Sequence, residues 1–184
     1  ILGPEFRVNQ FIQSAQLAPE IIHFKEEFVV IFLSQGLHID PNEKNNHAVY
    51  GRRFADNGTI IGDQFRISFL TLSYYHRPSA AILNDDYFVV VWKAYADTKG
   101  NLDTYGRICH REGNCISQEF RINSKYGFSY FDAGWTGEQI AVLDNQNFVV
   151  TYGMLAADPD GSDGVYARII TLSDLHITLP TTTT

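Results

Sequence analysis

The feature that most constrains the fold is an internal repeat, in which the motif Phe-Val-Val begins at Phe28, Phe88 and Phe148, at intervals of 60 residues. Two further motifs recur in the same order. One is Tyr-Gly-Arg, or Tyr-Ala-Arg in the last copy, and the other is Phe-Arg followed by Val or Ile and then by Asn or Ser. They begin at Tyr50, Tyr105 and Tyr166, and at Phe6, Phe65 and Phe120. Three motifs that keep one order indicate a supersecondary unit repeated three times.

Each copy of the repeat is predicted to contain four short antiparallel strands. The first strands cover 19–24, 80–83 and 139–143, and the second strands carry the Phe-Val-Val motif, whose apolar run is typical of strands buried on both faces. The other two motifs form a hairpin, with a tight turn at Asp56-Asn57-Gly58 in copy one. We therefore predict an all-β fold of three degenerate four-stranded antiparallel sheets, each resembling a propeller blade. Closure as a β-prism or trefoil is the alternative.

The ends of the repeat do not match each other. A single array is predicted over 1–179, with copies at about 10–68, 69–123 and 124–179, followed by a Thr-rich tail over 180–184. Residues 1–9 are a spare terminal strand, whose fourth-strand motif consists of Phe6, Arg7, Val8 and Asn9. Copy three ends in 176–179, a poor fourth strand. We expect the spare strand to pair with the edge beside Tyr166, in a neighbouring chain of a ring or filament, or within one chain if three sheets close in a circle.

Composition narrows the classes of partner. Hydrophobic residues make up 45% and charged residues 19%, which excludes a disordered chain. The aromatic content of 14%, with a single Met, favours strands over helices. A formal net charge of -7 argues against a nucleic-acid partner. No apolar run approaches the length of a membrane span, so no membrane-spanning segment is expected.

Cys109 and Cys115 flank a predicted hairpin turn. They align with Phe54 and Ile60 of copy one, which should face each other across the equivalent hairpin. Two cysteines placed in this way can form a disulfide, which we expect in a secreted protein. The alternative is a pair of free thiols in an aromatic core.

One loop of copy three has the spacing of an oxygen-ligand cation site. Asp158, Asp160 and Asp163 alternate with Pro, Gly and Ser in a tight acidic turn, and Ca²⁺ prefers several carboxylate and carbonyl oxygens. These three residues are therefore candidate calcium ligands, and no other cofactor is expected. The alternative is a solvated acidic turn.

Two segments are candidate glycosylation sites. Asn57 begins the sequon Asn57-Gly58-Thr59 on a predicted exposed turn. The tail of Thr181, Thr182, Thr183 and Thr184 resembles the O-glycosylated stalks of secreted proteins.

Two recurring groups of side chains each have a functional and a structural interpretation. Arg52, Arg107 and Arg168 occupy one strand position in the three copies, and they would either form a ring of anion-binding groups or each pair with an Asp of its own loop. An aromatic cluster would either stack on sugars or fill the core between sheets. It comprises Tyr74, Tyr75, Tyr126, Phe128, Tyr130, Phe131 and Trp135.

The motifs resemble the Phe-Arg-Val-Asn repeats found in tandem in large secreted bacterial proteins, including adhesin-like and RTX-type proteins. The resemblance rests on Glu5-Phe6-Arg7-Val8-Asn9, on the strand from Phe88 to Trp92, and on the Tyr-Gly-Arg strands. It departs where the family's turn Gly is replaced, by Glu27, Tyr87 and Asn147.

The resemblance implies an extracellular or cell-surface protein, and it brings no catalytic signature. We therefore expect a non-enzymatic structural or adhesive repeat protein. It would be a subunit of a fibre or surface assembly, self-associating head to tail by β-strand exchange. The alternative is a carbohydrate-binding, lectin-like propeller or prism module, with glycans as partners.

Overall fold

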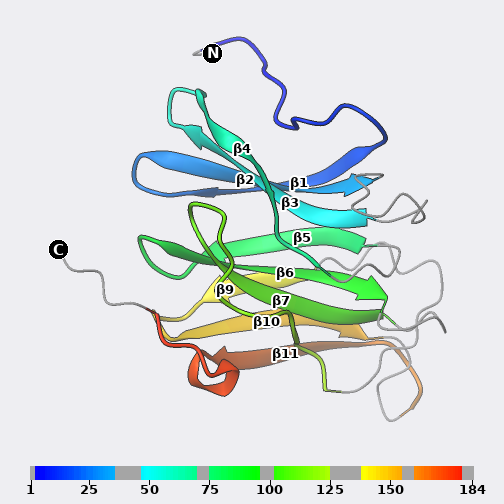
Figure 1. The fold of residues 1–184 in the computed structure, drawn as a ribbon. Helices are drawn as coiled ribbons and strands as arrows, with labels where there is room; N and C mark the ends of the chain where they lie inside the picture. Colours follow the sequence, from blue (N-terminus) through cyan, green and yellow to red (C-terminus); the bar gives the residue numbers. More distant parts are fainter. Residues whose placement is uncertain are drawn as a thin grey trace.

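The computed structural model describes residues 3–35, 47–69, 75–95, 102–124, 138–154 and 160–179. It consists of three antiparallel sheets stacked one on another (Figure 1). Sheet A contains β1 (Gln16–His23), β2 (Glu27–Gln35), β3 (His47–Ala55) and β4 (Ile60–Arg66). Sheet B contains β5 (Tyr75–Ile82), β6 (Tyr87–Tyr95), β7 (Leu102–His110) and β8 (Phe120–Arg121). Sheet C contains β9 (Gln139–Val142), β10 (Asn147–Met154) and β11 (Gly164–Thr171), which precedes a 3-10 turn η1 (Ser173–Leu175).

The three sheets share one pairing register, which confirms the predicted fold class. The strand that begins Phe-Val-Val pairs with the Tyr-Gly-Arg strand so that Ile31 lies opposite Gly51, Val91 opposite Gly106 and Thr151 opposite Ala167. The turns between the third and fourth strands use Gly58 and Gly113, whose φ values of 84° and 102° favour glycine. The glycine turns and the repeated apolar strands therefore both support the same arrangement of strands in each sheet.

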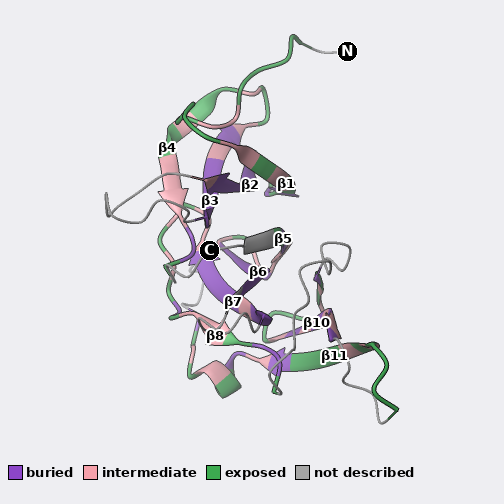
Figure 2. Ribbon diagram, turned by 90° about the vertical axis from the view of Figure 1, so that its right-hand side faces the viewer, coloured by how far each residue is buried: buried purple, intermediate pink, exposed green. Residues whose placement is uncertain are grey.

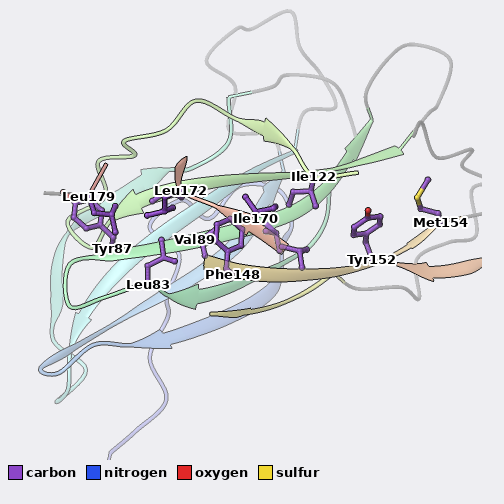
Figure 3. Packing of buried hydrophobic residues seen from close by; sticks show 13 residues of the cluster. Leu83, Tyr87, Val89, Ile122, Phe148, Tyr152, Met154, Ile170, Leu172 and Leu179 are labelled. Atoms are coloured by element: carbon purple, nitrogen blue, oxygen red, sulfur yellow. The ribbon is translucent and has the colours of Figure 1, made fainter. Parts of the chain in front are cut away.

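The core lies in two layers, one between each pair of adjacent sheets. The first layer joins Val29, Ile31 and Val49 of sheet A to Phe88 and Trp92 of sheet B. The second joins the opposite face of sheet B to sheet C (Figure 3). Its labelled members are Leu83, Tyr87, Val89, Ile122, Phe148, Tyr152, Met154, Ile170, Leu172 and Leu179. Sheet B is covered on both faces, so it is the central layer.

The first strands of the sheets lie beside one another. β1 contacts β5, and β5 contacts β9. The fourth strands, β4 and β8, lie at the opposite edges of sheets A and B. Side-by-side first strands with outward-running sheets are the arrangement of propeller blades. No helix among the described residues is long and apolar enough to cross a membrane.

The two ends of the array depart from the expected strands. The predicted spare strand at 6–9 is irregular, not a β-strand, and runs along sheet A. At the other end, β11 is the edge of the three strands described for sheet C. Residues 176–179 form no strand there; instead the Ile177 amide donates to the Leu172 carbonyl, and Leu179 is buried. Figure 2 shows β11 as a largely exposed strand.

Candidate functional site

The recurring arginines join each copy to the one before it. The Nη1 atoms of Arg52, Arg107 and Arg168 donate to main-chain carbonyls at 2.7, 2.7 and 2.5 Å. The acceptors are the third residues of the preceding Phe-Arg motifs: Val8, Ile67 and Ile122. This contact is neither of the two interpretations drawn from the sequence. A charged donor on a backbone carbonyl is a strong hydrogen bond, so the arginines act as links between blades.

A second hydrogen bond recurs between copies. The amide of Gln10 donates to Oε1 of Gln64 at 2.9 Å, and the amide of Phe69, one repeat later, donates to Oε1 of Glu119 at 2.5 Å. The glutamine contact is reciprocal, because the Gln64 amide donates to Oε1 of Gln10 at 3.1 Å. Each donor residue directly follows a Phe-Arg motif. Segment 6–10 therefore bonds to sheet A as the segment leaving β4 bonds to sheet B.

Apolar contacts of segment 6–10 repeat the same pattern. Phe6 approaches Gly58, and Phe65 approaches the equivalent glycine, Gly113. Val8 packs on the outer face of sheet A, which contains Phe32, Ala48 and Tyr50. Segment 6–10 thus occupies the place that the outer strand of a preceding blade would occupy. The sequence identified the motif, and the structure gives its position.

Sheet C has an uncovered apolar face at the other end of the array. Val165 and Ile169 of β11 are 87% and 62% exposed, and Leu143 beside β9 is 54% exposed. The residues equivalent to Val165 in sheets A and B, Val49 and Thr104, are buried by the next sheet. Sheet C therefore presents the surface on which a further blade would pack.

A buried polar cluster that the sequence analysis missed lies between copies two and three. Lys93 lies 3.3 Å from Oε1 of Glu138, and its Nζ donates to the Gly153 carbonyl at 3.1 Å. The hydroxyl of Thr104 donates to the same Oε1 at 3.4 Å. Glu138 is 1% exposed, and within the described part of the chain its Oε2 has no hydrogen-bond partner. These contacts join sheet B to the start of β9.

The polar cluster continues through Asp103, which is 1% exposed. Its Oδ1 accepts a hydrogen bond from Asn123 at 2.7 Å, and Arg121 lies 3.3 Å from Oδ2. Burial raises the pKa of Glu138, whereas the nearby Lys93 cation lowers it. A buried carboxyl group in this environment holds its proton more readily than an exposed one. A comparison of the copies could have revealed this cluster from the sequence, because polar residues replace apolar ones. Copy one has Leu33, Ala48 and Val49 where copy two has Lys93, Asp103 and Thr104.

Cys109 and Cys115 are joined by a disulfide. They face each other in an antiparallel bridge, in the same relation as the pair Phe54 and Ile60 of sheet A. Cys109 is fully buried. The disulfide therefore closes the hairpin that leads to β8 at a position where sheet A uses an apolar pair.

The acidic loop is described only in part. Asp158 lies outside the described residues, while Oδ1 of Asp160 accepts hydrogen bonds from the amide and hydroxyl of Ser162 at 2.9 and 2.6 Å. These bonds lower the pKa of Asp160. No group of three or more His, Cys, Asp or Glu side chains in the described ranges could hold a metal ion. Calcium binding by Asp158, Asp160 and Asp163 stays a prediction.

The remaining sequence candidates are placed as follows. Asn57 is exposed in its turn, where its Oδ1 accepts a hydrogen bond from the amide of Thr59 at 2.9 Å. The Thr tail lies outside the described residues. So does most of the aromatic cluster, namely Tyr74, Tyr126, Phe128, Tyr130, Phe131 and Trp135. Tyr75 lies in β5.

A groove runs between the segment that leaves β4 and the outer part of sheet B. Its volume is about 590 Å³, and it is lined by Phe69, Tyr105, Arg107, Gln118 and Glu119. Phe69 is 55% exposed, and the Arg107 guanidinium lies 4.2 Å from the centre of its ring. Aromatic, amide and charged groups thus line one open groove.

Comparisons with known proteins find likeness in structure only. No protein-family model matches the chain, and no curated protein matches it in sequence. An endo-arabinase from Bacteroides thetaiotaomicron is 16% identical with a TM-score of 0.50, over 84% of this chain and 56% of its own. An alpha-L-arabinofuranosidase from Lactobacillus brevis is 11% identical with a TM-score of 0.51, over 90% of this chain and 55% of its own. The chain therefore spans little more than half of either protein.

These neighbours correct one expectation and support another. Both are enzymes, so the expectation of a non-enzymatic protein is wrong. That expectation was drawn from the absence of a catalytic motif, and this absence does not exclude an enzyme. Catalytic groups are recognised by their geometry, and they need not form a local sequence motif.

The neighbours also support the predicted propeller-like fold. They are five-bladed propellers, and the share of each neighbour's chain that is matched is close to what three of five blades would give. The described part of the chain has a β-propeller fold made of three consecutive blades.

Proposed function

We propose that this chain is a unit of an extracellular structural or adhesive assembly, in which a further blade continues its array. The observation that carries the proposal is the position of segment 6–10. Arg52 binds the Val8 carbonyl as Arg107 binds the Ile67 carbonyl inside the array. The Gln10 amide bonds to Gln64 as the Phe69 amide bonds to Glu119. Segment 6–10 is therefore seated as the outer strand of a blade whose other strands come from elsewhere.

The surface of sheet C supports the same proposal. Val165 and Ile169 are largely exposed on β11, and β11 is also the edge of the three strands described for sheet C. Burial of each large apolar side chain contributes about 1.5–3 kcal/mol before entropy losses. An added strand would also satisfy the backbone groups of the edge. The Cys109–Cys115 disulfide favours an oxidising, extracellular location.

Deletion of residues 1–10 is expected to abolish assembly of the chain. The physical reason is that the deletion removes the strand that a further blade needs, and also the Val8 carbonyl to which Arg52 donates. Light scattering over a range of concentrations measures the assembly state. Deletion of the tail at 180–184 is the matched control and should leave that state unchanged. An undeleted chain that stays monomeric at every concentration would overturn the proposal.

A second candidate function is carbohydrate binding, which is favoured by the groove between the segment that leaves β4 and the outer part of sheet B. Phe69 is an exposed aromatic ring beside Gln118 and Glu119, whose polar groups can bond to sugar hydroxyls. The two structural neighbours are an endo-arabinase and an alpha-L-arabinofuranosidase, so arabinose-containing polysaccharide is the ligand class to test first.

Phe69→Ala is expected to weaken binding of the chain to soluble arabinan by about tenfold, an effect near the lower end of the roughly 1–3 kcal/mol by which an aromatic side chain holds a stacked nucleic-acid base. Affinity electrophoresis or calorimetry measures the change. Phe11→Ala is the control, because Phe11 is 45% exposed and does not line the groove. Equal binding by both variants and the unaltered chain would remove the groove from consideration.

A further inference from the structure

We propose that the groove between the segment that leaves β4 and the outer part of sheet B binds an acidic sugar, a uronate unit of a polysaccharide, through its carboxylate group. This inference rests on the second candidate function, carbohydrate binding, and gives the ligand of that function a charge. Phe69 follows β4 of sheet A, whereas Tyr105, Arg107, Gln118 and Glu119 belong to sheet B and the segment before β8. The groove therefore lies at a junction between two adjacent sheets.

The equivalent place on sheet A is bridged by side-chain hydrogen bonds. There Gln10 and Gln64 bond to each other at 2.9 and 3.1 Å, and Nε2 of Gln10 donates to Oδ1 of Asp63 at 3.0 Å. One repeat later, Phe69 stands in the place of Gln10, and Glu119 stands in the place of Gln64. The phenyl ring of Phe69 cannot make these side-chain bonds, and it is 55% exposed. The second copy thus has an open groove where the first has a polar bridge.

Arg107 presents unpaired donors to the groove from a fixed position. Its Nε donates to the Ser117 carbonyl at 2.9 Å, and its Nη1 donates to the Ile67 carbonyl at 2.7 Å. A guanidinium group has five N–H donors, so three of them have no partner among the described residues, although Arg107 is only 7% exposed. The two carbonyl anchors hold the side chain in place before a ligand arrives, which lowers the entropy cost of binding.

A second guanidinium group lies beside the same aromatic ring. The Cζ atoms of Arg107 and Arg66 lie 4.2 and 5.8 Å from the centre of the Phe69 ring. The Nε of Arg66 donates to the Ser68 carbonyl at 2.5 Å, and in the described part of the chain no carboxylate pairs with this arginine. Two cationic groups therefore meet at one exposed ring.

A comparison with sheet B shows how Arg66 comes to lack a carboxylate. Arg121 has the same position in its motif, and its Nη1 lies 3.3 Å from Oδ2 of the buried Asp103. Sheet A has Ala48 at the position of Asp103. Sheet A thus keeps the cation of this pair without its anion.

The charges around the groove favour an anionic ligand. Arg66 and Arg107 bring two positive charges, and Glu119 is the one acidic residue among the described residues that line the groove. This local excess of positive charge occurs on a chain whose formal net charge is -7. A carboxylate forms short paired hydrogen bonds with guanidinium groups. It would accept hydrogen bonds from the donors that Arg107 leaves unpaired.

A sugar acid combines the groups that fit this groove. The carbon–hydrogen face of a sugar ring can lie on the exposed ring of Phe69, and its hydroxyl groups can bond to the exposed amide of Gln118. Its carboxylate supplies the acceptor for Arg107. The volume of about 590 Å³ is within the usual range of ligand pockets. A neutral arabinose unit offers the first two contacts but lacks the charged one.

The test compares an oligogalacturonate with its methyl ester, which has the same sugar rings without the charge. Calorimetry of the full 184-residue chain in a low-salt, calcium-free buffer measures both dissociation constants. The constant for the acid should be lower by about tenfold or more, the effect of a hydrogen bond to a charged group. This comparison uses the unaltered chain, so it does not depend on the folding of a variant.

Two variants locate the anion on the protein. Arg66→Gln should weaken binding of the acid by about threefold, the size expected for a partly exposed ion pair, and should leave binding of the ester unchanged. Arg7→Gln is the matched control, because Arg7 has the same motif position, is exposed and does not line the groove. Thermal unfolding by circular dichroism checks that both variants are folded.

The outcomes separate this inference from the function on which it rests. A preference for the acid that Arg66→Gln reduces and Arg7→Gln does not would support the acidic-sugar site. Equal binding of acid and ester would overturn the inference and leave carbohydrate binding standing. A preference that Arg66→Gln does not change would place the anion elsewhere, and equal binding of dextran sulfate would show attraction to any polyanion; either result overturns the site. No binding of the acid, the ester or soluble arabinan would overturn both the inference and carbohydrate binding.

Discussion

Lys93→Leu is expected to lower the free energy of unfolding by about 3–5 kcal/mol at neutral pH, since it leaves a buried carboxyl group without its cation. The substitution is sterically conservative within this fold, because copy one has the buried Leu33 at the same position. Glu138 is 1% exposed, and Lys93 and Thr104 are the groups that contact its Oε1 among the described residues. The loss is therefore electrostatic.

The loss should depend on pH in one direction. Burial raises the pKa of Glu138 above its ordinary value of 4.5, and removal of the Lys93 cation raises it further. Above 4.5 the unfolded chain releases this proton while the folded variant retains it, so unfolding becomes more favourable as pH rises. The deficit should therefore be largest at neutral pH and should shrink as pH falls toward 4.5. Urea denaturation of the unaltered chain and the variant at pH 7 and pH 5 measures it.

Two further variants show whether the ion pair is the cause. Lys93→Leu combined with Glu138→Leu removes both charges and should recover much of the lost stability, as replacement of a buried pair by apolar residues often does. Lys25→Leu, at an exposed lysine, should change the free energy by no more than about 0.5 kcal/mol. A deficit that is independent of pH and persists in the double variant would contradict this account of the cluster.

Phe148→Ala is expected to cost about 3–5 kcal/mol, the range for removal of a fully buried aromatic side chain. Phe148 has no exposed surface, and it packs in the layer between sheets B and C with Tyr87, Val89 and Ile122. Its ring centre lies 6.3 Å from that of Phe120. The cavity left by alanine would be lined from both sheets, so neither sheet can collapse into it without moving the other.

Thermal and urea unfolding measure this loss, with Phe11→Ala as the control. Phe11 is 45% exposed in the N-terminal segment, and its truncation should cost far less. Phe88→Ala should cost as much as Phe148→Ala, because Phe88 is fully buried at the same position of the first layer. A small effect at both buried positions would mean that the sheets do not pack as described.

The elements of the fold were predictable because they depend on local patterns. Asn57-Gly58 marks a hairpin, and Phe28, Phe88 and Phe148 mark three equivalent strands. The positions of Phe54 and Ile60 in copy one placed Cys109 opposite Cys115. Each of these signals involves residues close in sequence or repeated at a fixed interval.

The contacts of the candidate sites were not predictable in the same way. Arg52, Arg107 and Arg168 bind backbone carbonyls of the preceding copy, and a carbonyl acceptor carries no residue-specific signal. Lys93 lies at the end of an apolar strand, and its partner Glu138 belongs to the next copy, so the pair forms only when the sheets stack. The absence of a local catalytic motif also misled the prediction about enzymes, since residues from different blades can form one site.

Hydrogen exchange at the β11 edge tests the central claim of this account most directly. In sheets A and B the amides of Val49, Thr104 and Ile108 donate to side chains in the segments that flank the fourth strands, namely Ser68 after β4, Asn123 after β8 and Ser117 before β8. The equivalent amides in sheet C belong to Val165 and Ile169, which therefore point toward the place of the added strand.

In the full chain we predict slow exchange at the Val165 and Ile169 amides, measured by nuclear magnetic resonance, and fast exchange at both in a chain that lacks residues 1–10. The amides of Tyr166 and Arg168, which point toward β10, should be protected in both chains. Fast exchange at Val165 and Ile169 in the full chain, at concentrations well above those needed for assembly, would show that segment 6–10 does not complete sheet C and would contradict the account.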